Sequence, residues 1–383
     1  MLNDSNRDRL PALTSLRFFA AFHVFLFHIG AMGAIFGPLW FQRISSIGYV
    51  GVSFFFVLSG FILVYTYAGR PMNAKNFWQA RFARVYPAYA FSLLLTLPFF
   101  LWGVFHFAEI KLPFLAFQAA HAKMAALFEI LLLQSWIPPA ALSWNSVGWS
   151  LSVEAFFYAI FPWLLGRVGR LSRRGLLLSI ALCWLASNAI SLGYTVLRPD
   201  GLLHPGADVY TGWMNVVKFF PLARLPEFLM GMAAGFLFLK HRSERSKALP
   251  FVATGAAMIA IVAALAAKLP YAVIHTALLS PAFTAIVYGI ALRPRWSAIL
   301  EARPLVLLGE ASYSMYLIHA NFVFPFFHDN KGALRNANFL GLAMCLTLVV
   351  AVSLGIYAGI ERPARRKLRP RAAEAAKTMA ATA

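Results

Sequence analysis

Two basic side chains lie in an apolar run, residues 14–37, that is long enough to cross a membrane. Arg17 and His28 are eleven positions apart, so on a helix they point from one face, within about 20° of each other and about 16 Å apart along the axis. Charged and titratable side chains are unfavourable in lipid, which makes both residues candidates for chemistry. His23 points about 140° away from His28 and is predicted to be a packing or secondary polar residue.

A carboxylate occurs at a comparable depth in another apolar run, residues 145–168. Glu154 follows Trp149 and Ser150 and lies about 14 Å into the expected helix. A buried imidazole and a buried carboxylate at one depth predict a proton-handling pair, in which Glu154 orients His28 and stabilises its charged form. An ion pair that only holds two helices together would explain the same residues.

Further polar residues occupy two later apolar runs. Arg224 and Glu227 are three positions apart in the run 214–239, the spacing of a salt bridge within one helix. The run 304–328 is too polar to face lipid on all sides, so we expect it to line a cavity or another helix. Its polar residues are Glu310, Ser312, Tyr313, Ser314, Tyr316 and His319.

Basic and aromatic residues alternate just before the run at 85–107. Arg81 and Arg84 are three positions apart and Trp78 precedes Arg81 by three, so a short interfacial helix would present them on one face. Together with Tyr86, these residues could bind the phosphates and the adenine ring of a nucleotide. Anchoring to anionic lipid headgroups is an equally good use of the same residues.

Repeated apolar runs of about 20 residues predict the helices that position these side chains. We predict an all-α, polytopic membrane protein with ten membrane-spanning helices. An eleventh apolar stretch, 124–136, is short and is followed by Pro138 and Pro139, which predicts a re-entrant or interfacial segment. The ten predicted spans are 14–37, 48–69, 85–107, 145–168, 175–197, 214–239, 249–267, 273–292, 304–328 and 338–360.

The composition agrees with a membrane location. Of the 383 residues, 60% are apolar and 13% are charged, whereas an ordinary soluble domain has about 25% charged residues. Cys183 and Cys345 lie inside apolar runs, so no disulfide framework or cysteine-based metal site is implied.

Most of the formal charge of +20 is explained by membrane orientation. With the N-terminus in the cytoplasm, 24 of the 34 lysine and arginine residues fall on the cytoplasmic side and 7 on the other side, as the positive-inside rule requires. We therefore predict that both termini are cytoplasmic, with an N-terminal segment 1–13, a membrane domain 14–360 and a basic tail 361–383. The basic residues are dispersed over six segments, which argues against nucleic-acid binding.

Seven segments, in order, resemble the acyltransferase-3 family of integral membrane O-acyltransferases that modify bacterial surface and exported glycans. The first segment has Arg17 and His28 at the spacing typical of the family, and the second contains Ser59. Ser53 and Ala155 depart from the pattern, because many members have acidic residues there. The segments are LTSLRFFAAFHVFLFHIG, GYVGVSFFFVLSGFIL, FWQARFARVYPAY, SVGWSLSVEAFFYAIFP, RLPEFLMGMAAG, LGEASYSMYLIHA and GIERPARRKLR.

The resemblance implies transfer of an acyl group, usually acetyl from cytoplasmic acetyl-CoA, to a sugar hydroxyl by a multi-pass protein of the bacterial inner membrane. The implied partners are the lipid bilayer, acyl-CoA as co-substrate and a glycan acceptor, with no permanently bound cofactor and no metal. The acceptor itself, and the choice between acetyl and succinyl, stay open.

The resemblance also suggests roles for individual residues. His28 would be the general base or, alternatively, a covalent carrier of the acyl group. Arg17 would bind the phosphates or the pantetheine arm, Arg81 and Arg84 the nucleotide end, and Glu154 would hold the imidazole tautomer. A second group would polarise the thioester carbonyl, bind the acceptor or support the site: Ser59, Trp149, Ser150, Arg224, Glu310, Tyr313 and His319.

A proton-coupled transporter or exporter is the alternative function, since ten spans with a histidine and a glutamate at mid-depth also describe such a protein. No pair of matching broken helices in two related halves is evident from the sequence, which weighs against it. A membrane scaffold without activity would give Arg17, His28 and Glu154 no clear purpose in lipid.

Overall fold

The computed structural model is a helical bundle and describes residues 10–31, 37–110, 112–240, 245–328 and 338–368. No strand occurs in this part of the chain. The helices of the first half are α1 (Pro11–Ala31), α2 (Leu39–Ser46), α3 (Gly51–Tyr67), α4 (Ala74–Phe105), α5 (Phe107–Ile110), α6 (Ala116–Ala120), α7 (Ala122–Ile130) and α8 (Trp149–Gly169). Those of the second half are α9 (Arg173–Leu197), α10 (Gly212–Phe219), α11 (Pro221–Lys240), α12 (Ala248–Leu265), α13 (Tyr271–His275), α14 (Ser280–Ala291), α15 (Arg303–His328), α16 (Asn338–Ile356) and α17 (Arg362–Leu368).

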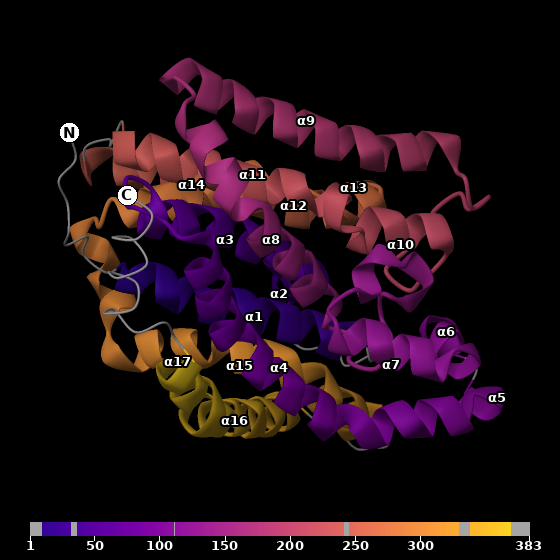
Figure 1. Cartoon of the computed structure of the whole chain (residues 1–383). Helices are drawn as coiled ribbons and strands as arrows, with labels where there is room; N and C mark the ends of the chain where they lie inside the picture. The colour runs from indigo at the N-terminus through magenta and orange to yellow at the C-terminus, as the bar shows by residue number, and fades with distance from the viewer. Residues whose placement is uncertain (1–9, 32–36, 111, 241–244, 329–337, 369–383) are drawn as a thin grey trace.

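The prediction of an all-α membrane bundle is confirmed. In the described residues, nine helical segments are long and apolar enough to cross a membrane, and they match nine of the ten predicted spans. The remaining predicted span, 304–328, is the 26-residue helix α15. Figure 1 shows α9 and α16 along opposite edges of the bundle, with α3, α8 and α11 between them. Which side of the membrane each end faces stays a prediction.

Helix α4 corrects the prediction of a separate interfacial helix around Arg81 and Arg84. It begins at Ala74, where the side chain of Asn73 accepts a hydrogen bond from the backbone N–H of Asn76, and it continues without interruption to Phe105. Pro87 lies inside this helix instead of ending a loop. Proline is tolerated in membrane helices because neighbouring groups satisfy the carbonyl that it leaves without a donor. The two arginines are therefore part of the bundle.

Two predicted spans are broken helices. The span 214–239 divides into α10 and α11 at Phe220, whose backbone is extended because Pro221 follows it. The span 273–292 divides into α13 and α14 across residues 276–279, where Pro281 stands in the first turn of α14. The apolar runs at 214–239 and 273–292 each predict one continuous helix, which is not what forms.

The ends of two predicted spans differ in what the structure shows of them. Helix α1 is described as far as Ala31, and residues 32–36 of the first predicted span lie outside the described residues. At the other end of the chain, α16 continues through a π-helical turn, Tyr357–Glu361, into α17, so the helix extends beyond the predicted boundary at residue 360. The segments 1–9 and 369–383 lie outside the described residues, and the predicted division into segment, domain and tail stays a prediction.

The apolar stretch 124–136 forms the nine-residue helix α7, which is too short to span a bilayer. The buried side chain of Glu129 holds α7 against α4, because its Oε2 accepts hydrogen bonds from the hydroxyl of Tyr89 at 2.6 Å and from Nε2 of Gln134 at 3.1 Å. Burial raises the pKa of the Glu129 carboxyl well above its usual value. Tyr86 adds a hydrogen bond from its hydroxyl to the carbonyl of Ile130 at 3.0 Å.

Close backbone contacts fix α3, α11, α1 and α15 relative to one another. A Cβ atom on Gly231 of α11 would lie 2.0 Å from the carbonyl oxygen of Val57 in α3. A Cβ on Gly309 of α15 would lie 2.0 Å from the carbonyl oxygen of Thr14 in α1. Small residues at such contacts let membrane helices approach closely enough for extensive van der Waals packing. These four helices therefore form a rigid frame.

We expect Gly309→Ala to destabilise the protein by about 1–3 kcal/mol, because the added methyl group forces α15 away from α1. Thermal unfolding in detergent measures this as a lower Tm. Gly166→Ala on α8 is the matched control, since a Cβ there meets no atom within 4 Å. Equal Tm values for the two variants would contradict the close packing of α1 and α15.

Candidate functional site

Two cavities lie end to end inside the bundle. The arginine cavity, of about 170 Å³, is lined by Arg17, Ser59, Arg81, Arg84, Ser150, Glu154, Tyr158, Ser312, Tyr313 and apolar neighbours. The histidine cavity, of about 900 Å³, is lined by His28, Tyr49, Trp149, Asp208, Tyr210, Lys218, Tyr271, His275 and apolar neighbours. Along α1, residues 13–17 face the first cavity and residues 24–31 the second, so the two lie at opposite ends of this helix. Val52 and Tyr316 line both cavities.

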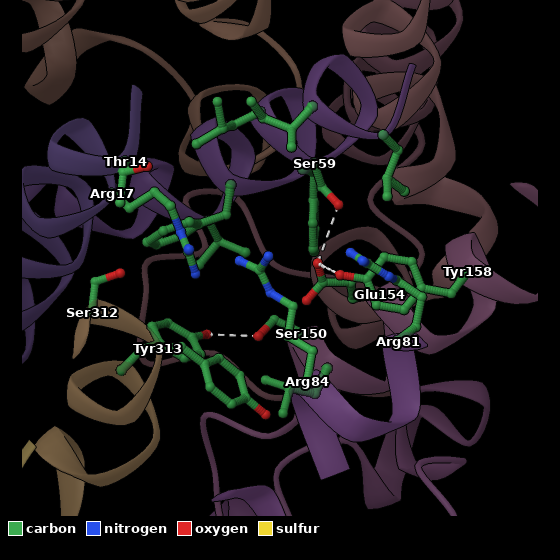
Figure 2. A pocket seen from close by; sticks show the side chains of 18 of the residues that line it. Thr14, Arg17, Ser59, Arg81, Arg84, Ser150, Glu154, Tyr158, Ser312 and Tyr313 are labelled. Atoms are coloured by element: carbon green, nitrogen blue, oxygen red, sulfur yellow. Dashed lines mark hydrogen bonds between the residues drawn. The ribbon is translucent and has the colours of Figure 1, made fainter. Parts of the chain in front are cut away.

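The arginine cavity has an excess of positive charge. Its lining carries three guanidinium groups and the single carboxylate of Glu154. Figure 2 shows the guanidinium groups of Arg17 and Arg84 extending into the cavity. Among the described residues, neither group has an ion-pair or hydrogen-bond partner. Unpaired cations at this depth are costly, so the cavity is suited to an anionic ligand.

Arg81 and Glu154 are held by their surroundings. Arg81 donates a hydrogen bond from Nη2 to the hydroxyl of Tyr67 at 3.4 Å, and its guanidinium lies 5.8 Å from the ring centre of Tyr158. Glu154 accepts hydrogen bonds at Oε1 from the hydroxyl of Tyr158 and from Ser59 Oγ, the latter at 3.2 Å (Figure 2). Ser59 therefore lies in the lining of the arginine cavity, and its predicted supporting role stays a prediction.

His28 lines the histidine cavity and is paired with His319 behind it, and backbone carbonyls fix the tautomers of both rings. His28 Nδ1 lies 2.9 Å from the carbonyl oxygen of Val24, and His319 Nδ1 lies 2.7 Å from that of Tyr316. A carbonyl oxygen can only accept, so each Nδ1 carries a proton when the ring is neutral. His319 Nε2 is then a lone pair, and it lies 3.2 Å from His28 Nδ1. His28 is left with an unprotonated Nε2, the form of a general base.

This arrangement corrects the predicted pair of His28 and Glu154. The two residues line different cavities, and the hydrogen bonds of Glu154 go to Ser59 and Tyr158. The predicted depth of Glu154 assumed a helix from residue 145, whereas α8 begins at Trp149. The group that orients His28 is His319, which is 1% exposed.

Arg224 is a structural residue and lies outside both cavities. Its Nε lies 3.0 Å from Glu227 Oε2 in the salt bridge that the spacing suggested, and both side chains are fully buried. Its Nη1 donates to the carbonyl of His275 at 2.9 Å, at the break between α13 and α14. Its Nη2 donates to Ser53 Oγ at 3.0 Å. The pair thus satisfies polar groups beside the interrupted helix.

Three other predicted site residues also point elsewhere. Trp78 donates its indole N–H to the carbonyl of Tyr158 at 3.1 Å, and Tyr86 contacts α7. Glu310 accepts a hydrogen bond from the hydroxyl of Tyr357. None of the three lines either cavity. By contrast Ser150 and Tyr313 line the arginine cavity and Trp149 lines the histidine cavity, and their roles stay predictions.

Three residues near the cavities had no predicted role. Lys218 is 1% exposed and donates from Nζ to the carbonyls of Ala207 and Val209, at 3.0 and 2.7 Å, which holds the loop before α10 against the histidine cavity. His275 stacks on Tyr49 with ring centres 5.2 Å apart. Glu361, in the π-helical turn, accepts a hydrogen bond from Ser314 at 3.3 Å. The signal for each was an ionisable residue in or beside an apolar run.

The described residues contain no group of three or more histidine, cysteine, aspartate or glutamate side chains that could hold a metal ion. The arginine cavity is lined by a cationic set, and the histidine cavity by His28, His275 and other polar and aromatic side chains.

Comparisons with known proteins indicate what this architecture is related to. A family model described as an acyltransferase domain, Acyl_transf_3, matches residues 10–358. The acyltransferase MdmB of Streptomyces mycarofaciens is 29% identical, covering 94% of this chain and 92% of its own length. The exopolysaccharide production protein ExoZ of Rhizobium meliloti is 28% identical over 85% of this chain and 92% of its own length.

A further relative is longer than this chain. The O-acetyltransferase OatA of Staphylococcus aureus is 24% identical over 94% of this chain, which spans 57% of the length of OatA. No solved structure matches the chain.

Proposed function

Because the chain belongs to the acyltransferase-3 family and is a membrane O-acyltransferase, we propose that it transfers an acetyl group from acetyl-CoA to a sugar hydroxyl of an exported or surface polysaccharide. The observation that carries this proposal is the meeting of a cationic cavity and a histidine cavity at Val52 and Tyr316. A two-substrate transfer requires a site for each substrate and one point where they meet. The names of OatA and ExoZ support acetyl as the acyl group and a polysaccharide as the acceptor.

The donor occupies the arginine cavity in this proposal. Guanidinium groups bind phosphate through two parallel hydrogen bonds, and Arg17 and Arg84 make no hydrogen bond or ion pair among the described residues. The cavity volume of about 170 Å³ accommodates only a part of acyl-CoA, such as a phosphate group or one end of the pantetheine arm. The nucleotide end of CoA then lies outside the cavity. The indole N–H of Trp78 is already bonded to the carbonyl of Tyr158, and Trp78 does not line the cavity.

The acceptor occupies the histidine cavity. Its volume of about 900 Å³ is in the range of small-molecule sites, and its aromatic lining with a few polar groups is typical of them. The acceptor hydroxyl gives its proton to Nε2 of His28 while its oxygen bonds to the carbonyl carbon of the thioester. The carbon–sulfur bond then breaks, and the sulfur takes the proton back from Nε2 to give CoA thiol.

His319 is a positioning residue in this reaction. Its Nε2 accepts the hydrogen bond from His28 Nδ1 both before and after His28 takes up a proton, so the ring keeps its orientation and its charged form is stabilised. A free lone pair on Nε2 serves a general base and a nucleophile alike, so direct transfer and a covalent relay through His28 both agree with this tautomer.

The arginine cavity faces the cytoplasm in the proposed orientation, in the bacterial inner membrane. It lies toward the N-terminal ends of α1 and α4 and the C-terminal end of α3, beside the loops to which the basic residues assign a cytoplasmic location. In this orientation the arginine cavity opens toward the cytoplasm, where acetyl-CoA is present.

Broken helices also occur in transporters, and two predicted spans are broken here. Arg224 of α11 donates to the carbonyl of His275 at the break that precedes α14, so the buried ionic pair has a structural role at this break. Transport is retained only as the alternative, and counterflow of a glycan in liposomes without acyl-CoA would favour it.

We expect His28→Ala to lower the rate of acetyl transfer by about 100- to 10,000-fold, the usual contribution of a general base. Purified protein, labelled acetyl-CoA and a glycan acceptor measure this rate. His23→Ala is the matched control on α1, because His23 bonds the carbonyl of Ile44 and lines neither cavity. Wild-type rates in His28→Ala would exclude His28 as the base.

Arg84→Gln should raise the KM for acetyl-CoA by about 10- to 100-fold, the loss expected for one hydrogen bond between charged groups. The control is Arg174→Gln, an exposed arginine at the start of α9. An unchanged KM with a lower yield of folded protein would show that Arg84 supports the structure or binds lipid headgroups instead.

His319→Leu should lower kcat by about 10- to 100-fold with little change in the KM for acetyl-CoA, because it removes the acceptor for His28 Nδ1. His319→Gln retains an acceptor oxygen and should recover part of kcat. Equal loss in both variants, with reduced thermal stability, would indicate a purely structural role.

A further inference from the structure

The two cavities are separated by the side chains of Val52 on α3 and Tyr316 on α15, which contribute to the walls of both. We call these two side chains the septum. The three arginines lie on one side of the septum, and His28 lies on the other. A thioester held from the arginine side and an acceptor near His28 are closest to each other at the septum, since its two residues are the ones that line both cavities.

Tyr316 is a fixed half of the septum. Its hydroxyl accepts a hydrogen bond from Ser150 Oγ at 2.9 Å and donates one to the carbonyl oxygen of Val147 at 3.2 Å. The residue is 6% exposed, and its ring packs against Phe55 with centres 6.0 Å apart. Rotation of the ring away from the septum would break both hydrogen bonds.

Val52 is equally constrained. The start of α3 lies directly on α1, since a Cβ on Gly51 would be 2.8 Å from the carbonyl oxygen of Ala20. The backbone of α3 at this point therefore cannot move toward α1 to widen the space beside Val52. Valine is branched at Cβ and has one strongly preferred rotamer in a helix. The side chain at position 52 therefore determines how much space remains beside Tyr316.

We propose that the septum selects the transferred acyl group by size, with Val52 setting the upper limit. This inference rests on the proposed function. In the transfer, the bond from the acyl carbon to sulfur breaks and the bond to the acceptor oxygen forms, so only the acyl group has to lie at the septum. Acetyl has a single methyl beyond the carbonyl, whereas each additional methylene must displace Val52 or Tyr316, which the surrounding contacts resist.

The test compares acetyl-CoA with butyryl-CoA on the full-length enzyme. Val52→Ala should raise the ratio of kcat/KM for butyryl-CoA to that for acetyl-CoA by about 10-fold or more, the usual effect of a methylene-sized change in an apolar site. Val52→Ile adds a methylene and should lower the same ratio. The isoleucine variant serves as the test if the alanine variant does not fold.

The matched control is Val57→Ala on the same helix. Val57 is fully buried but lines neither cavity, so its truncation should leave the ratio unchanged. A wild-type ratio in both position-52 variants that still transfer acetyl would overturn the septum and leave the proposed function intact, and so would an equal change in Val57→Ala. Wild-type protein that is folded but transfers no acyl group from either CoA ester would instead overturn the proposed function.

Discussion

The close approach of α3 to its neighbours is the constraint on which the rest of the structure depends. Without a hydrophobic driving force between helices in lipid, van der Waals contact between backbones has to hold the bundle together. Gly60 and Gly231 make this possible between α3 and α11, since a Cβ on either would lie 2.0–2.2 Å from a carbonyl oxygen of the other helix. Val52 and Ser59 project from this fixed helix into the cavities. Close backbone contacts between helices therefore determine where cavity-lining side chains such as Ser59 lie.

The buried ionic pair of Arg224 and Glu227 follows from the same crowding. A break in a membrane helix leaves backbone carbonyls without donors, and no water is present to satisfy them. Arg224 supplies a donor to the carbonyl of His275, and Ser53 Oγ lies 3.4 Å from the carbonyl of Thr276 and donates to it. Glu227 supplies the buried carboxylate of this cluster. The cluster stabilises the interrupted helix that forms one wall of the histidine cavity.

The sequence predicted the positions of the spans and most of the polar residues that line the arginine cavity, because both depend on local patterns. Arg17 and His28 are on one face of α1, and repeated apolar runs mark the helices. The sequence did not predict which side chains on different helices contact one another. Glu154 and His28 lie at similar estimated depth, yet the cavities that they line are separated by the septum. The partner of His28 is His319, 291 residues away, and helical periodicity carries no signal for that pairing.

The predictions of continuous helices across the two breaks were wrong for a related reason. Pro221 and Pro281 interrupt their helices, whereas Pro87 and Pro98 lie inside the continuous helix α4. The composition of a run does not reveal which proline will find neighbours to satisfy the carbonyl it leaves without a donor. Tertiary packing decides the outcome in each case.

The septum also has an electrical consequence. A membrane potential acts on every charge that crosses the low-dielectric barrier, with about 2.3 kcal/mol of work per elementary charge per 100 mV. In the proposed reaction, the phosphates of CoA stay with the arginines on one side, and the acyl group that passes between Val52 and Tyr316 is neutral. The transfer then moves an acyl group across the barrier without moving net charge. Acylation by this route would proceed at the same rate in an energised membrane and in a depolarised one.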